Sequence, residues 1–178
     1  MRYLKLAALG FLALGISANA STGTWKSGVS AQGSELNDRN EYRPGMGVNG
    51  FTTMEHATPN GAGVAGLGIR ANYTNYQIEG DQVGKNLNEG GVALTGLVGP
   101  NSTYFQPRVG GHVGYERLSS ANFVDLGADL MASYKVTPRF GINAMVTPTW
   151  YMKGSDLAKN TDYLTKIGLG VVWSTPGA

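Results

Sequence analysis

The sequence predicts an all-β fold, an eight-stranded antiparallel up-and-down transmembrane β-barrel preceded by a cleavable signal peptide. Three observations support this prediction. Apolar residues recur at every second position in eight stretches, these stretches are longer than ordinary strands, and their aromatic residues gather near both strand ends. The chain has 178 residues with 27 glycines and no cysteine, which favours β structure and excludes disulfides.

Residues 1–20 have the three parts of a secretory signal peptide. A short basic start with Arg2 and Lys5 precedes an apolar run, Leu6 to Ile16, and the small-residue site "SANA". The apolar run is too short for a membrane-spanning helix. We therefore expect an exported mature chain, residues 21–178, that folds as one barrel domain. The alternative is an N-terminal anchor that is not cleaved.

The charge balance narrows the classes of partner. The chain has 14 basic side chains, two of them in the signal peptide, against 12 acidic ones, so the mature chain is formally neutral. We expect no nucleic-acid partner from this balance. Two histidines and no cysteine give no metal-ligand spacing, and the glycine patterns precede no helix. The sequence thus predicts no catalytic residue, no cofactor and no metal.

Period-two alternation and turn residues define the strands. Most exceed the ordinary length of about five or six residues, and transmembrane strands need about nine to eleven. The eight strands are expected at residues 23–31, 46–56, 63–78, 90–98, 103–117, 122–136, 139–152 and 162–174.

The connections delimit these strands in order. The first strand ends before the long charged stretch "QGSELNDRNEYRP", the second at the short turn "ATPNGA", the third at the long "EGDQVGKNLNE" and the fourth at "GPNS". After the fifth, sixth and seventh strands come "LSSA", "VTP" and "GSDLAKNT". Short turns alternate with longer external loops in outer-membrane barrels. Only "LSSA" is shorter than this alternation requires.

The last four strands each sort apolar side chains to one face. In the fifth, "TYFQPRVGGHVGYER", Phe105 and Tyr115 share a face, whereas Arg108, His112 and Glu116 lie on the other. The sixth, seventh and eighth strands repeat this division. The polar face is expected to fill the barrel interior, which eight strands leave just wide enough for side chains.

Aromatic residues on the apolar face are expected to form two girdles at the membrane interfaces. Ten residues separate members of a pair on one strand, about 33 Å along the strand and roughly 25 Å in height at a tilt of about 40°. A soluble core would place its largest side chains in mid-strand. The expected interface aromatics are Trp25, Tyr73, Phe105, Tyr115, Tyr134, Phe140, Trp150, Tyr163 and Trp173.

Charged residues on the opposite face are expected to form a polar network inside the barrel, because charges removed from water must be paired. A tight hairpin at "LSSA" would place His112 opposite Asp125 and Arg108 opposite Asp129. The expected network comprises Arg70, Arg108, His112, Glu116, Asp125, Asp129, Lys135, Arg139 and Lys166.

The ending "KIGLGVVW" is similar to the C-terminal assembly signal of outer-membrane barrels, through Lys166, Gly168, Val171 and Trp173. Five residues, "STPGA", follow the aromatic residue, which usually lies at or next to the chain end. By its signal peptide, strand count and ending, the chain resembles small eight-stranded, porin-like outer-membrane proteins of the OmpA-barrel and OmpX kind. The resemblance implies export through the periplasm to the bacterial outer membrane, contact with lipid and lipopolysaccharide, and recognition by the barrel-assembly machinery.

The function expected from this resemblance is structural or surface-interacting, with external loops that contact an extracellular ligand or surface. Three alternatives remain open. A lipid A-modifying enzyme in the barrel would use His112 with Ser133 and Asp125, a passive channel would need an open lumen, and a soluble periplasmic β-barrel would turn its apolar face inward to bind a small apolar ligand.

Overall fold

The computed structural model describes residues 23–36, 44–77, 86–118, 121–152 and 161–176. The predicted signal peptide lies outside these residues. The described part of the chain contains no helix that is long and apolar enough to cross a membrane.

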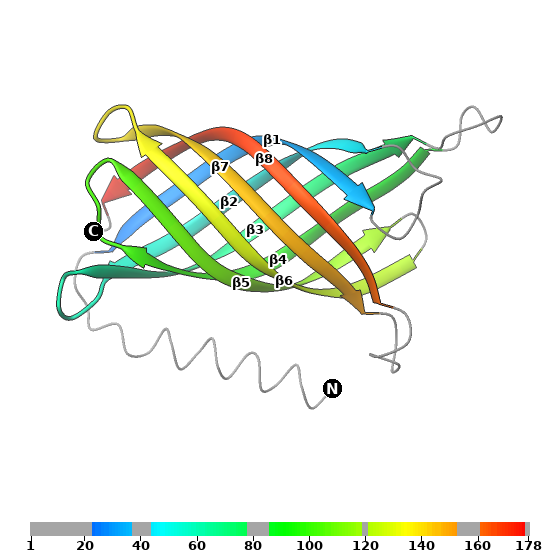
Figure 1. Cartoon of the computed structure of the whole chain (residues 1–178), viewed down its shortest axis with the longest axis horizontal. Helices are drawn as coiled ribbons and strands as arrows, with labels where there is room; N and C mark the ends of the chain where they lie inside the picture. The colour runs from blue at the N-terminus through cyan, green and yellow to red at the C-terminus, as the bar shows by residue number, and fades with distance from the viewer. Residues whose placement is uncertain (1–22, 37–43, 78–85, 119–120, 153–160, 177–178) are drawn as a thin grey trace.

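Eight antiparallel strands form a closed barrel (Figure 1). Each strand pairs with its neighbours in the chain, and β1 pairs with β8 to close the sheet, so that Thr24 lies opposite Pro176. This confirms the predicted fold class. The strands are β1 (Thr24–Leu36), β2 (Gly45–Ala57), β3 (Gly63–Gln77), β4 (Asn86–Pro100), β5 (Phe105–Leu118), β6 (Ala121–Lys135), β7 (Phe140–Met152) and β8 (Thr161–Pro176).

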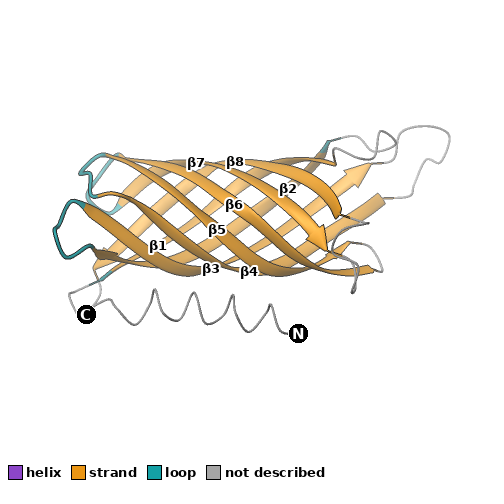
Figure 2. Ribbon diagram, turned by 60° about the horizontal axis from the view of Figure 1, so that its bottom comes forward, coloured by secondary structure: helices purple, strands orange, loops and turns teal. Residues whose placement is uncertain are grey.

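One end of the barrel, which we call the turn end, carries three tight connections at residues 58–62, 101–104 and 136–139 (Figure 2). The first residue of β1 and the last of β8 lie at this same end. In the first turn, the Gly61 amide donates to the Thr58 carbonyl at 2.8 Å. Gly61 has a φ of 68°, which glycine adopts without steric cost.

The alternation of side chains places the apolar face outside and the polar face inside. Ile69 and Leu169 are 57% and 68% exposed on the outer face, whereas Arg70 and Asp125 are 3% and 0% exposed in the lumen. A soluble barrel would bury the apolar set instead. The alternative of an apolar face turned inward is therefore wrong.

The strand boundaries differ most from the prediction at the end opposite the turns. There β1 continues to Leu36, although its last residues are polar and resemble a loop. The side chains of Gln32 and Ser34 point into the lumen, where Gln32 Nε2 donates to Thr74 Oγ1 and Ser34 Oγ hydrogen-bonds Tyr76 Oη, both at 2.7 Å. Hydrogen bonds in the polar interior thus allow a strand to continue through residues that lack the apolar alternation of the rest of the barrel.

Candidate functional site

The lumen is filled by side chains that form four groups along the barrel axis. From the turn end, we call them the lower cluster around Glu55, the apolar layer around Phe51, the central cluster around Asp129 and the upper cluster around Lys166. Eight strands leave room for side chains to fill the interior, and these groups occupy it. Each group draws on strands from opposite sides of the barrel.

In the lower cluster, one carboxylate binds two cations. Arg108 donates from Nη2 to Glu55 Oε2 at 2.9 Å and from Nε to Oε1 at 3.1 Å, a two-point contact. Lys26 Nζ lies 2.8 Å from Glu55 Oε2 and donates to Gln106 Oε1 at 2.8 Å. These contacts tie β1, β2 and β5 together near the turn end.

The apolar layer lies above this cluster. Its members come from β2, β4, β6 and β8, and each is between 4% and 8% exposed. It consists of Phe51, Leu97, Met131 and Val172.

The central cluster is built around Asp129. Arg70 Nη1 donates to Asp129 Oδ1 at 2.5 Å, and Thr95 Oγ1 donates to Oδ2 at 2.6 Å. The His112 ring bridges the two aspartates of β6, with Nδ1 3.0 Å from Asp129 Oδ1 and Nε2 3.3 Å from Asp125 Oδ2. One cation and one imidazole therefore face two buried carboxylates.

The β5–β6 register corrects two predicted pairs. Leu118 pairs with Ala121, which shifts the register by two residues and places His112 opposite Gly127 and Arg108 opposite Met131. The shift keeps every side chain on its predicted face, because two residues are one full pleat. His112 still reaches Asp125 diagonally, but the predicted contact between Arg108 and Asp129 is wrong.

The upper cluster places one lysine between two glutamates. Lys166 Nζ donates to Glu116 Oε1 at 2.6 Å and forms an ion pair with Glu89. Tyr151 Oη donates to Glu116 Oε2 at 2.5 Å, and Tyr76 Oη donates to Glu89. All five side chains are at most 2% exposed, so this cluster fills the lumen at the end opposite the turns.

Two predicted network residues lie outside these groups. Lys135 is half-buried at the last position of β6. The prediction that Arg139 lies in the interior is wrong: it is exposed in the turn that precedes β7, because that strand starts at Phe140 rather than at residue 139. Its carbonyl accepts a hydrogen bond from the Ser174 amide at 2.8 Å.

Five ionisable residues of the clusters lie outside the predicted network. Alternation alone could have identified Lys26, which follows the outward-facing Trp25. The polar neighbours of Glu89 predict a loop, although it lies on β4. The others lie on strands with a weaker pattern or, like the two tyrosines, have no formal charge that would mark them as network members: the unpredicted set is Lys26, Glu55, Tyr76, Glu89 and Tyr151.

The geometry does not assemble the residues of the enzyme alternative. The Oγ of Ser133 makes no hydrogen bond to any residue that the structure describes. Ser133 pairs with Gln106 in the register, nearer the turn end than His112, which pairs with Gly127. Because a nucleophile must lie within hydrogen-bond reach of its base, these two residues do not form a nucleophile–base pair. The described residues also contain no group of three or more His, Asp or Glu side chains able to hold a metal ion.

The predicted interface aromatics all lie on the outer face. Phe140 pairs with Trp173 near the turn end. Towards the other end Trp150 pairs with Tyr163, and their rings lie 5.2 Å apart at 46°. All nine are at least partly exposed: Trp25, Tyr73, Phe105, Tyr115, Tyr134, Phe140, Trp150, Tyr163 and Trp173.

The residues of the predicted assembly signal lie on β8 and divide between its faces. Lys166 and Gly168 face the lumen, whereas Val171 and Trp173 face outward.

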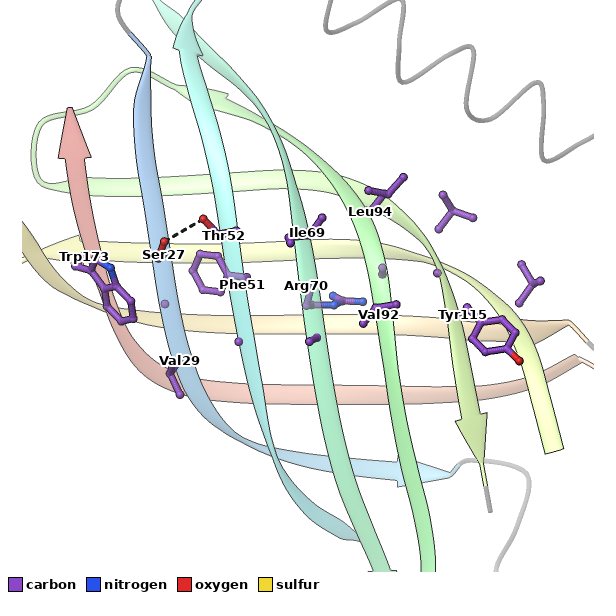
Figure 3. A pocket seen from close by; sticks show the side chains of 17 residues that line it. Ser27, Val29, Phe51, Thr52, Ile69, Arg70, Val92, Leu94, Tyr115 and Trp173 are labelled. Carbon is purple, nitrogen blue, oxygen red and sulfur yellow. Dashed lines mark hydrogen bonds between the residues drawn. The ribbon is translucent and has the colours of Figure 1, made fainter. Parts of the chain in front are cut away.

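An apolar hollow on the outer face extends from β8 across β1 to β6 (Figure 3). Outward side chains such as Val29, Ile69 and Leu94 border it. The one hydrogen bond among its labelled residues joins Ser27 Oγ and Thr52 Oγ1 at 3.0 Å. Ligand sites combine apolar walls with several convergent polar groups. This hollow lacks them and belongs to the apolar surface of the barrel.

No family model matches the chain, and no curated protein matches its sequence. The fold is similar to that of Neisserial surface protein A, with a TM-score of 0.54 and 12% identity over 85% of this chain and 96% of that one. A major outer-membrane protein from Thermus thermophilus gives a TM-score of 0.54 and 14% identity over 85% and 99%. The outer-membrane enzyme PagL gives a TM-score of 0.49 and 13% identity over 84% of this chain and 99% of that one. At these identities the likeness to Neisserial surface protein A and to the Thermus thermophilus protein shows the fold alone.

Proposed function

We propose that the protein is an integral outer-membrane β-barrel with a structural or surface-interaction role. The observation that carries this proposal is the reversed distribution of side chains: the apolar residues cover the outside, and the ionic residues fill the inside. A lipid environment stabilises this arrangement, whereas water would leave the apolar outer face exposed.

The aromatic residues support a membrane plane that is perpendicular to the barrel axis. Pairs such as Phe140 and Trp150 stand ten residues apart on one strand, which corresponds to roughly 25 Å of height in a tilted strand. That height equals the apolar band of an outer-membrane barrel. The two sets of aromatics would therefore meet the lipid headgroups, including lipopolysaccharide in the outer leaflet.

The filled lumen favours an anchor over a channel. Four groups of buried side chains occupy the axis, and the tight turns lie at the same end as both termini of the barrel. In this proposal the turn end is periplasmic, and the connections at 37–44, 78–85 and 153–160 are presented to the cell surface, where they contact an extracellular ligand or surface. Residues 1–20 direct export.

The last strand of the chain supports the proposal that the barrel-assembly machinery binds the protein during its biogenesis. We assign recognition by the barrel-assembly machinery to β8, through Lys166, Gly168, Val171 and Trp173. β8 completes the barrel by pairing with β1 along the whole length of β1, from Thr24 to Leu36. A signal on this strand is therefore available until the barrel closes.

Epitope tags test the orientation and the surface role together. One tag is inserted within residues 153–160, and a matched control tag is inserted in the turn at 58–62, at the opposite end of the barrel. Antibody should label the first tag on intact Gram-negative cells and the second only after the outer membrane is permeabilised. Labelling of the control tag on intact cells, or of neither tag before permeabilisation, would contradict the proposal.

A further inference from the structure

One cross-section of the lumen is formed by apolar side chains from alternate strands. Phe51, Leu97, Met131 and Val172 come from β2, β4, β6 and β8, so they approach the barrel axis from four directions. An eight-stranded barrel is only wide enough for its side chains. Four buried side chains from alternate strands therefore close this cross-section.

The clusters on either side of the apolar layer contain polar groups that can bind water. Above the layer, Arg70 Nε and Nη2 are buried and make no hydrogen bond among the described residues. Below it, the same holds for Ser133 Oγ. Buried polar groups of this kind are generally satisfied by ordered water. The ionic clusters can thus be hydrated, whereas the four side chains of the apolar layer have no polar atom that could bind water.

A small cavity borders the layer. Its lining residues are Phe51, Thr53, Arg70, Thr95, Leu97, Asp129, Met131 and Met145. Its volume is about 10 Å³. This is close to the minimum that one water molecule requires. The cavity therefore has no room for an ion with its hydration shell, although Thr53 Oγ1, which has no partner among the described residues, offers a polar atom to a single water molecule.

We propose that the apolar layer is the barrier that makes the lumen impermeable to ions, whereas the ionic clusters position the strands. An ion that crossed the layer would lose its hydration shell without a polar replacement, which is the basis of hydrophobic gating. The inference goes beyond the proposed anchoring role and rests on the proposed insertion into a membrane.

Conductance across a planar lipid bilayer tests this inference with the folded protein purified from outer membranes. Phe51→Ser removes the ring and adds a hydroxyl, and Leu97→Asn keeps nearly the same volume but makes the layer polar. Two controls separate the explanations. Met54→Ser changes the outer face of the same strand, and Glu55→Gln neutralises the carboxylate of the lower cluster without changing its size.

The wild type and both controls should show no conductance steps, and at least one layer variant should show steps. If F51S and L97N insert as heat-modifiable barrels and stay as impermeable as the wild type, the inference is overturned. It is also overturned if E55Q conducts as well as the layer variants, because the ion pairs would then be the barrier. Failure of the wild type to insert would contradict the proposed membrane role instead.

Discussion

Asp129 shows how single residues hold this interior together. Its carboxylate accepts contacts from Arg70, Thr95 and His112, which belong to three other strands. Breaking a buried ion pair from one side leaves an uncompensated charge in a medium of low dielectric constant. The stability of the barrel should therefore depend on this one side chain more than on any exposed charge.

We predict that Asp129→Ala lowers the free energy of unfolding by about 3–5 kcal/mol, because Arg70 loses its buried partner. Urea unfolding in lipid vesicles measures this change. A second substitution, Arg70→Met, should recover part of the loss. Arg139→Met is the control and should have an effect within about 0.5 kcal/mol, since Arg139 is exposed. Recovery by Arg108→Met in place of Arg70→Met would contradict the observed register.

The close approach of strands at Gly110 gives a second prediction at this scale. A Cβ at Gly110 would lie 1.8 Å from the Gly96 carbonyl oxygen, so a methyl group cannot fit without backbone movement. Gly110→Ala should cost about 1–3 kcal/mol of unfolding free energy. At Gly33 a Cβ would meet nothing within 4 Å. Gly33→Ala is therefore the matched control, and equal costs at both sites would refute the packing explanation.

Among the strands, β8 has two roles: it closes the barrel by pairing with β1, and it contains the proposed assembly signal. Trp173 lies opposite Ser27 in this closing pair and opposite Phe140 on the other side. Trp150 is an outward tryptophan with similar exposure near the other end of β7. The two tryptophans therefore share a type of surface position but differ in the strand that carries them.

Trp173→Ala should slow assembly of the barrel, whereas Trp150→Ala should not. The measurement is the heat-modifiable fraction in outer membranes at successive times after induction. Equal assembly rates for the two variants would mean that the tryptophan on β8 has no special role in recognition.

Strand identity could be predicted from the sequence wherever the outer face is apolar. β5 to β8 show the pattern plainly, since lipid-facing positions such as Val113 and Leu169 alternate with lumen positions. The ends of β1 and β4 are not predicted because Gln32 and Glu89 are stabilised by partners on other strands, which local sequence does not reveal. The partners of Arg108 and Asp129 were missed for a related reason: they lie across the lumen, and a hairpin register cannot predict them.

For the molecule as a whole, a membrane-spanning barrel requires that the outer face is in contact with lipid. Leu94 and Val98 are both about half exposed on the outer face of β4. Leu94 lies in mid-strand, and Val98 is near the turn end. In a bilayer, arginine is costly near the midplane and tolerated near the interface. In water, both substitutions would be nearly neutral.

Leu94→Arg should therefore lower the free energy of unfolding in vesicles by about 2–4 kcal/mol, and Val98→Arg by only about 0–1 kcal/mol. Chemical unfolding of the two variants beside the wild type measures the difference. Equal, small effects at both positions would indicate that the outer face is not in contact with lipid.

The most direct test of the membrane-spanning barrel is the location and gel mobility of the native protein. The full chain is expressed in a Gram-negative host, the inner and outer membranes are separated, and each fraction is run on SDS gels with and without boiling. We predict a band in the outer membrane whose mobility shifts on heating, as a closed and detergent-resistant barrel requires. A periplasmic band with no heat shift would contradict the account, because the apolar face could not then be in contact with lipid.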